Sequence, residues 1–395
     1  MARRGDRVLI AGGGIGGLAT AIALARRGID TEILERSDFT EQSGAGIQLG
    51  PNATRALQRL GVLEAIEPHS FRPEAISIYD GLSGRRLTSL PLGEAAEARY
   101  GTPYLTLHRA DLHAGLRAAA QSLAPITLTP GFELAAIDLK AGAVIARAGD
   151  GVEAQGASLI GADGLWSTVR AVVSPAARLR FAGGTAWRTR LPRGNLPAPF
   201  NDPVVGLWLG PDTHLVHYPV RGGDDLNVVA VTEGGAERHG WDQPAGAEAL
   251  CAGFTRWAKE SKSLLERADG WRSWSLYRLT SLGHWSDGPI ALLGDAAHPV
   301  LPYLAQGAAL AIEDAVTLAA CLVELRRDPS TAFRNYEALR RPRGGRVQSL
   351  ARRYGWLYHL RGPLRVARNL VLERRREARA LQRFDWLYQD PDQQS

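Results

Sequence analysis

The chain has 395 residues, of which 45% are hydrophobic and 22% charged, the composition of an ordinary globular protein with room for two or more substructures. It has no run of about twenty apolar residues and no signal-peptide pattern after Arg3-Arg4, which excludes a membrane-spanning helix, and we expect a cytoplasmic protein. The net charge of +6 is concentrated between Arg326 and Arg383, where 17 arginines stand against four acidic residues, but no nucleic-acid-binding motif accompanies it.

The first motif lies near the N-terminus. Val8 to Ala11 is an apolar run typical of a buried strand, and glycines follow it with the G-x-G-x-x-G spacing. Such glycines permit a tight turn, let a pyrophosphate approach the backbone, and let helix and strand pack closely. A second predicted strand, 31–35, ends in an acid, where this fold holds a ribose. The pattern predicts a dinucleotide site that includes Gly12, Gly14, Ile15, Gly16, Gly17, Glu35 and Arg36.

The second motif, Asp163-Gly164, comes directly after the apolar run 158–161, at the end of another predicted strand. Two interpretations of Asp163 stay open. Its carboxylate can bind the ligand, or it can cap the helix that starts near Ser167.

The third motif spans residues 289–315. Ile290 to Leu293 predicts a strand buried on both faces, and Asp295 places at its end a carboxylate suited to accept hydrogen bonds from ligand hydroxyls. Gln306 then opens an apolar helix whose first amides attract negative charge. We expect the strand end and the helix start to face one ligand; the alternative is a core helix with an incidental aspartate.

In this order and at these separations, the three motifs resemble the single-component FAD-dependent aromatic hydroxylases. The segments 44–55, 108–113, 214–219 and 301–308 are similar to the branch that acts on small hydroxybenzoates, especially the 3-hydroxybenzoate 6-hydroxylases, with salicylate and 6-hydroxynicotinate hydroxylases as more distant members. The resemblance covers nearly the whole chain. Trp166 departs from it, because a smaller or polar residue is expected there.

The resemblance implies an α/β fold like that of para-hydroxybenzoate hydroxylase. In it a Rossmann-like FAD-binding domain is interleaved with an antiparallel-sheet substrate domain and followed by C-terminal helices. Alternating apolar and polar residues in 74–80 and 181–282 are consistent with that sheet. We expect the FAD-binding domain in 1–72, 100–175 and 283–340, the substrate domain in 73–99 and 176–282, and the helices in 341–395.

The resemblance also implies roles at the cofactor. Arg109 binds the flavin's phosphate or ribityl side, Asp295 binds a nearby hydroxyl, and the glycine turn with Glu35 binds pyrophosphate and adenosine ribose. The amides of Gly307 and Ala308 stabilise negative charge on the reduced ring. The expected FAD-binding set is completed by Gln48, Asp163 and Pro302. NADH or NADPH is the expected reductant, and no metal is expected.

Two candidates for catalysis lie on the strand near residue 214. Because side chains alternate along a strand, His214 and Tyr218 share a face with Val216, while His217 points the other way. We expect His214 to act as base or proton relay and Tyr218 to orient the substrate. Gln306 bonds the substrate from the flavin side, and Asp80 is a weaker pocket candidate. The alternative for both strand residues is a half-buried position with satisfied hydrogen bonds.

The expected reaction is hydroxylation of a small phenolic acid by NAD(P)H and dioxygen through a flavin hydroperoxide. Two enzymatic alternatives stay open: a decarboxylating salicylate-type hydroxylase, and an oxygenase or epoxidase acting on a larger natural product. A third is a flavin-binding regulatory protein that docks through its basic tail. That tail, with a helix expected from Pro342 onward, predicts a homodimer surface, with peripheral lipid contact or core packing as alternatives.

Overall fold

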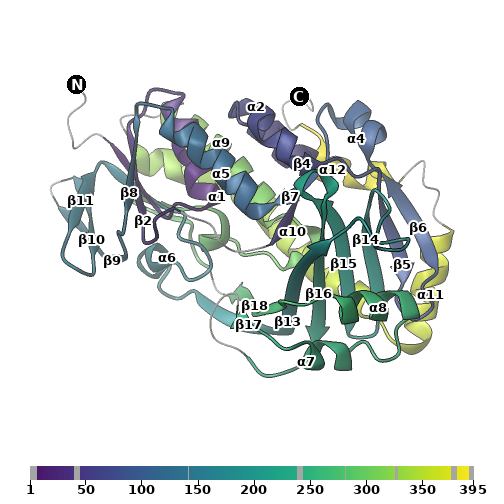
Figure 1. Cartoon of the computed structure of the whole chain (residues 1–395). Helices are drawn as coiled ribbons and strands as arrows, with labels where there is room; N and C mark the ends of the chain where they lie inside the picture. Colours follow the sequence, from purple (N-terminus) through teal and green to yellow (C-terminus); the bar gives the residue numbers. More distant parts are fainter. Residues whose placement is uncertain are drawn as a thin grey trace.

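The structure, a computed structural model, describes residues 7–39, 45–140, 142–237, 243–280, 282–324, 328–374 and 380–390. It is an α/β protein built around two large sheets, one at each end of the molecule (Figure 1). Two small three-stranded sheets complete the strands. Within the described ranges, no helix is both long and apolar enough to cross a membrane.

The six-stranded sheet has the order β19-β20-β12-β1-β2-β8 and is parallel except for β19. Its strands β1, β12 and β20 are buried along their whole length, which explains their continuous apolar sequences. The register aligns their last residues, so the three motifs that follow them start side by side at one edge. The strands are β1 (Val8–Ala11), β2 (Thr31–Glu35), β8 (Ile126–Pro130), β12 (Ser158–Gly161), β19 (Ser286–Asp287) and β20 (Ile290–Leu292).

Helices cover this sheet and enclose the largest apolar core. Helix α1 packs against α5 and α9, and α9 packs in turn against α2 and α10. The helices of this region are α1 (Ile15–Ala25), α2 (Pro51–Arg59), α3 (Leu63–Ile66), α5 (Arg109–Gln121), α6 (Thr168–Val173) and α9 (Gly307–Glu324). Short 3-10 turns are η1 (Glu67–His69), η3 (Gly294–Ala296) and η4 (Pro302–Leu304).

The eight-stranded sheet has the order β17-β18-β13-β16-β15-β14-β5-β6. It confirms the predicted sheet, with one correction: β14 and β5 pair in parallel, whereas their neighbours are antiparallel. A parallel pair needs a long crossover, and residues 81–203 supply it. The strands are β5 (Ala75–Asp80), β6 (Arg86–Pro91), β13 (Arg178–Pro192), β14 (Val204–Gly210), β15 (Thr213–Val220), β16 (Asp225–Glu233), β17 (Gln243–Pro244) and β18 (Arg272–Thr280).

Smaller elements join or flank the two sheets. The sheet β3-β7-β4 contacts β15 through β7 and β4, and η2 (Arg221–Gly223) follows β15. Helices α4 (Gly93–Tyr100), α7 (Ala247–Ala252) and α8 (Lys259–Arg267) lie at the end of the molecule that holds the large sheet, with α4 above the strands and α7 below them in the view of Figure 1. The small-sheet strands are β3 (Gly46–Leu49), β4 (Ser70–Phe71), β7 (Leu105–His108), β9 (Leu134–Lys140), β10 (Ala143–Ala148) and β11 (Glu153–Gly156). Strands β5 and β6 lie in the same sheet as β13 to β18, which agrees with placing residues 73–99 and 176–282 in one domain. The domain boundaries remain a prediction.

The C-terminal helices correct one expectation. Helix α10 (Pro329–Tyr358) begins thirteen positions before Pro342, which lies inside it. Asp328 accepts a hydrogen bond from the Thr331 amide and Pro329 follows at the first helical position, so the start signal lies there. Helix α11 (Gly362–Glu373) lies beside β6, and after η6 (Leu381–Phe384) helix α12 (Asp385–Tyr388) packs against α2 (Figure 1).

Candidate active site

The glycine turn after β1 is shaped by close contacts. Gly12 has a φ of +101°, and a Cβ there would lie 2.5 Å from the Ala162 carbonyl oxygen. A Cβ on Gly17 would lie 1.9 Å from the Gly12 carbonyl oxygen. In contrast, a Cβ on Gly14 would meet nothing within 4 Å. The turn is therefore packed on two sides and open at its second glycine, where α1 begins without a side-chain cap.

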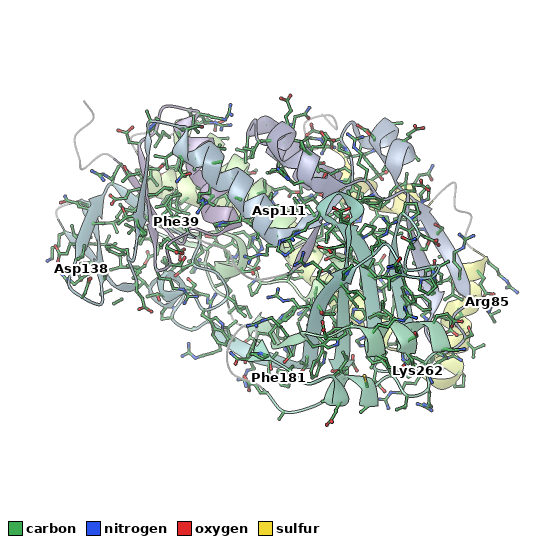
Figure 2. All side chains as sticks on the ribbon, in the orientation of Figure 1. Phe39, Arg85, Asp111, Asp138, Phe181 and Lys262 are labelled. Carbon is green, nitrogen blue, oxygen red and sulfur yellow. The ribbon has the colours of Figure 1, made fainter. Side chains whose placement is uncertain are left out.

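Glu35, at the end of β2, is tied to this turn. One carboxylate oxygen accepts a hydrogen bond from the Gly13 amide at 2.6 Å, and the other accepts from the Ser37 amide and hydroxyl at 2.8 Å. Phe39, labelled in Figure 2, packs its ring against Gly13. Arg36 is exposed. Glu35 thus positions the glycine turn, and its oxygens keep lone pairs for a further donor.

Asp163 serves as a helix cap and keeps an unused acceptor. Its Oδ2 accepts hydrogen bonds from the amides of Thr168 at 2.8 Å and Val169 at 3.1 Å, at the start of α6. Its Oδ1 is buried and has no hydrogen-bond partner among the described residues. Burial raises the pKa of this carboxyl. A buried acceptor without a partner is costly unless a ligand or water completes it.

Arg170, not predicted as a site residue, joins the second motif to the third. Its guanidinium donates to the Ala296 carbonyl oxygen at 3.1 Å and to the Leu165 carbonyl oxygen. Trp166, the departure from the family pattern, is 51% exposed and meets Tyr277 edge-on, with ring centroids 4.9 Å apart. The large ring is therefore accommodated at the surface.

Asp295 lies where the third strand end meets α9. The residue is open to solvent, but the surrounding protein partly desolvates the carboxyl and raises its pKa, against the opposing charges of His298, Arg109 and Arg170. Its Oδ1 lies 4.0 Å from the Cβ position of Gly307, the first residue of α9. Arg109 is half-buried at the first residue of α5. The expected convergence of strand end and helix start is present, with a cation nearby.

The β15 face carries the two catalytic candidates. His214 and Tyr218 are both buried, and the His214 ring lies 5.4 Å from that of Tyr303 in η4, the turn that leads to α9. Nδ1 of His214 is 2.8 Å from Nε2 of His359. His217 points to the opposite face and packs on Phe200, as strand alternation predicts. Burial lowers the pKa of His214 well below its usual value, so the imidazole is neutral near pH 7.

Tyr218 adjoins the small sheet. It hydrogen-bonds with the side chain of Gln48 in β3, and Oε1 of Gln48 accepts a hydrogen bond from the Tyr104 hydroxyl at 2.8 Å. Burial raises the pKa of the Tyr218 phenol, which therefore stays protonated. Asn227 pairs with Tyr218 across the strands, and its Nδ2 is buried without a partner among the described residues. Gln48, expected at the cofactor, thus lies directly beside a catalytic candidate.

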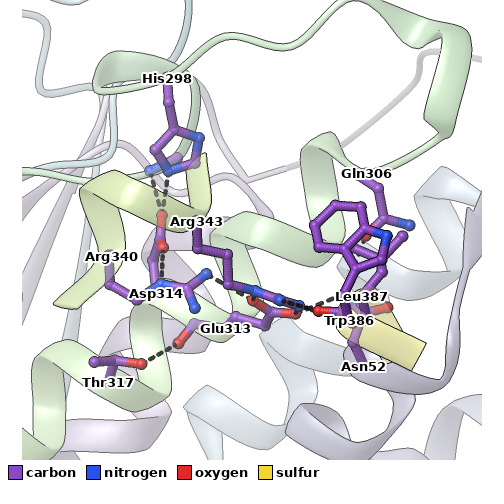
Figure 3. Close-up of polar contacts among 11 residues, drawn as sticks. Asn52, His298, Gln306, Glu313, Asp314, Thr317, Arg340, Arg343, Trp386 and Leu387 are labelled. Atoms are coloured by element: carbon purple, nitrogen blue, oxygen red, sulfur yellow. Dashed lines mark hydrogen bonds and ion pairs between the residues drawn. The ribbon is translucent and has the colours of Figure 1, made fainter. Parts of the chain in front are cut away.

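Gln306 is held at the head of α9 by a buried polar network (Figure 3). Asn52 donates from Nδ2 to Gln306 Oε1 at 3.0 Å and to Glu313 Oε1 at 2.6 Å. Glu313 pairs with Arg340 at 2.7 Å and Arg343 at 2.6 Å. Arg343 also donates to the backbone of α12, at the Trp386 and Leu387 carbonyl oxygens.

The neighbouring Asp314 fastens α9 to the third motif. Its carboxylate contacts His298 at 2.5 Å and Arg340 at 2.6 Å, and it accepts the Gly294 amide at 3.3 Å. Burial acts to raise the pKa of Glu313 and of Asp314, but the arginines, and His298 for Asp314, outweigh it and lower each pKa to about 2. Both acids are therefore ionised, with their charges balanced from α10.

Two remaining candidates lie at the margin. Asp80, at the end of β5, uses its oxygens for Ser83 and Arg365 and is separated from His214 by strand β14. Pro302 starts η4 and is exposed. Of the network residues only Gln306 was predicted; Asn52, Glu313, Asp314, Arg340 and Arg343 were not, although two adjacent acids in the apolar run of α9 are a signal that they need partners.

The residues at the strand ends fit FAD by their own chemistry. The space at Gly14 and the free amides of α1 suit a pyrophosphate, while the spare acceptor of Asp163 and the carboxylate of Asp295 suit hydroxyls. Arg109 supplies positive charge and Gly307 starts a helix next to Asp295. The β15 face adjoins η4 through His214 and Tyr303.

Comparison with known proteins agrees. A family model described as FAD binding domain matches residues 6–351. The 3-hydroxybenzoate 6-hydroxylase of Polaromonas naphthalenivorans (strain CJ2) is 36% identical over 383 residues, covering 96% of this chain and 95% of the relative. The 3-amino-4-hydroxybenzoate 2-monooxygenase of Streptomyces cremeus is 37% identical over 390 residues, covering 98% and 96%.

Among solved structures, Klebsiella pneumoniae HpxO complexed with FAD and uric acid has a TM-score of 0.84 at 26% identity, covering 95% of both chains. Motifs, strand-end geometry and comparisons point to the same class of protein. The chain belongs to the FAD binding domain family and, within it, to the FAD-dependent aromatic hydroxylases.

Proposed function

We propose that the protein hydroxylates a small phenolic aromatic acid, with 3-hydroxybenzoate as the first candidate, using FAD, NAD(P)H and dioxygen. The observation that carries this proposal is the β15 face, where a buried neutral imidazole beside the turn leading into α9 shares one side of the strand with a buried protonated phenol. Relatives named for two different hydroxybenzoates support the substrate class.

The two side chains have complementary roles in this proposal. Neutral His214 accepts the phenolic proton of the substrate, which makes the ring electron-rich. Tyr218 remains protonated and donates a hydrogen bond to the substrate carboxylate. FAD, when bound, passes electrons from the nicotinamide to dioxygen and supplies the electrophilic oxygen. The residues proposed to hold it are Gly12, Gly14, Ile15, Gly16, Gly17, Glu35, Arg36, Gln48, Arg109, Asp163, Asp295, Pro302, Gly307 and Ala308.

A substrate panel tests the proposal. Hydroxybenzoates are added to the FAD-loaded protein while NADH or NADPH oxidation, oxygen consumption and product mass are recorded together. We expect H214N and Y218F to retain FAD and to form far less product. The matched control is H217N, on the same strand but the opposite face, which should retain hydroxylation. Normal product yield from both H214N and Y218F would remove them from the reaction.

The same assay separates the alternatives. A product that has lost the substrate's carboxyl group as carbon dioxide identifies a salicylate-type hydroxylase. An epoxidised or larger product identifies a tailoring oxygenase. Flavin binding without substrate-stimulated NAD(P)H oxidation favours a regulatory role. Gln306, held by Asn52, is proposed to contact the substrate from the flavin side; Asp80 is retained only as an outer pocket residue.

We also propose a cytoplasmic homodimer that uses NADH. Support for the dimer comes from α11, whose exposed apolar side chains are Leu364, Val366, Leu370 and Val371. Sizing of the purified protein tests it. Binding of a monomer to anionic vesicles would instead favour peripheral lipid contact through this helix.

A further inference from the structure

We propose that His359 and Glu233 carry the substrate proton from His214 to solvent, so that the three side chains form a proton relay. The inference rests on the proposed function, because it requires His214 to accept that proton. It adds two residues from distant parts of the chain, the end of α10 and the end of β16.

The relay is visible as a continuous chain of hydrogen bonds. Nδ1 of His214 is 2.8 Å from Nε2 of His359, and Nδ1 of His359 is 2.5 Å from Oε1 of Glu233. The His214 side chain is buried and that of His359 is 3% exposed, whereas that of Glu233 is 44% exposed. The chain therefore begins at the candidate base and ends in water.

When both imidazoles are neutral, one arrangement of protons satisfies all of these contacts. Glu233 is ionised, since its hydrogen bond with His359 lowers its pKa, so it accepts from Nδ1–H of His359. Nε2 of His359 must then accept from Nδ1–H of His214. This tautomer leaves Nε2 of His214 with a lone pair and no proton, which is the state needed to accept one from a phenol.

Proton transfer along this chain is balanced. The substrate O–H bond breaks as a proton reaches Nε2 of His214; the Nδ1 proton moves to His359, whose own Nδ1 proton moves through Glu233 to water. Both rings then hold their protons on Nε2. When the hydroxylated product regains its phenolic proton, the same steps run backwards and restore the first tautomers. No electrons move in the relay.

A structural role is the competing explanation, because these contacts also tie the end of α10 to the large sheet. The His359 ring also lies 5.9 Å from that of Tyr303, and its carbonyl oxygen accepts a hydrogen bond from the Asp212 amide at 3.3 Å. The ring of Tyr358 lies 5.5 Å from that of His214. Asp212 forms an ion pair with Arg361, two residues beyond His359. This pair fastens the same segment to the β14–β15 turn through side chains outside the relay, and the hydrogen bonds of Asp212 with His359 and Glu233 are made by its backbone. D212N keeps that backbone and is therefore a matched control; asparagine also tolerates the positive φ of 60° at this position.

The experiment follows protons directly. FAD-loaded wild type and the variants H359Q, E233Q, E233D and D212N are mixed with 3-hydroxybenzoate in weak buffer, and proton release is timed by stopped flow with an indicator dye. Glutamine preserves the hydrogen-bonding length of each side chain but does not conduct protons. Hydroxylation rate, its solvent deuterium isotope effect, KM and thermal stability are measured in parallel.

We expect H359Q and E233Q to slow proton release and kcat by about tenfold or more, within the range of positioned proton transfer. The solvent isotope effect should rise in both, KM should change little, and E233D should recover most of the rate. D212N should behave like wild type in proton release. Lower thermal stability with wild-type proton release in H359Q and E233Q would establish a clamp and overturn the relay.

The two proposals can fail separately. Hydroxylation by wild type with unaltered proton release in H359Q and E233Q refutes the relay and leaves the proposed function standing. Lack of hydroxylation of any hydroxybenzoate by wild type refutes the proposed function, and the relay with it.

Discussion

Arg340 offers a sharp test of the charge network beneath α9. Its guanidinium pairs with both Glu313, at 2.7 Å, and Asp314, at 2.6 Å, and its side chain is only 8% exposed. The substitution R340M removes the charge and keeps most of the volume. Asp314, 1% exposed, is then left with His298, while Glu313 keeps Arg343 and Asn52.

We expect R340M to lower the free energy of unfolding substantially, because the buried carboxylate of Asp314 loses its arginine partner. Breaking a buried ion pair from one side costs about 3–5 kcal/mol. The control is R341M, one residue along α10, where the arginine side chain is 47% exposed and pairs with Glu337 at 3.0 Å with i,i+4 spacing. Such a surface pair is worth about 0.5 kcal/mol or less.

The stability of the protein should also depend on pH through these two acids. The folded pKa of Asp314 is lowered from 3.8 to about 2, so its contribution to stability is present above the unfolded pKa and is lost as pH falls through the folded value. Glu313 behaves in the same way, because its pKa is lowered from 4.5 to about 2 in the folded protein. We expect the stability difference between wild type and R340M to be largest near pH 7 and to shrink between about pH 4 and 2.

Urea unfolding of both variants and wild type at equal, saturating FAD measures these differences, with tryptophan fluorescence as the signal. An R340M protein no less stable than R341M, or a difference that stays constant from neutral pH down to the acid limit of folding, would refute the argument that buried charge pairing holds α9 in place.

Three further predictions follow from the site. G14A should fold normally but bind FAD about tenfold or more weakly, about 1.4 kcal/mol, because its Cβ enters the open space of the turn, whereas G17A should lose stability because its Cβ lies 1.9 Å from a carbonyl oxygen; flavin fluorescence titration and thermal melts compare them. Burial keeps His214 neutral below its usual pKa, so the single-turnover hydroxylation rate should hold as pH falls to about 6.5 and decline only at lower pH, where protonation removes the acceptor; H214N should lack this decline. W166A should cost about 1 kcal/mol or less and leave FAD affinity unchanged, since Trp166 is 51% exposed and contacts Tyr277; weaker FAD binding would contradict this placement.

The three motifs could be predicted because each is local. An apolar strand followed by glycines or by Asp-Gly has one geometry, and parallel strands bring their carboxyl ends to the same edge. The shared side of His214 and Tyr218 on β15 could be predicted as well, because side chains alternate along a strand whatever its neighbouring strands are. Helix capping by Asp163 was one of two interpretations. In the structure Oδ2 forms the cap, and Oδ1, without a partner among the described residues, is left for a ligand.

By itself, the sequence determined the strand–turn–helix units and the side of β15 that presents His214 and Tyr218, since these depend on residues a few positions apart. The type of cofactor followed from the family that its motifs resemble. Only the tertiary structure decided which distant side chains meet: His359 with His214 across 145 residues, and Asn52 with Gln306 across 254. It also decided that Pro342 lies within α10 and that β14 pairs in parallel with β5. The physical reason is that such contacts arise when separate backbones pack together, and no local periodicity records which buried charge or ring will find which partner.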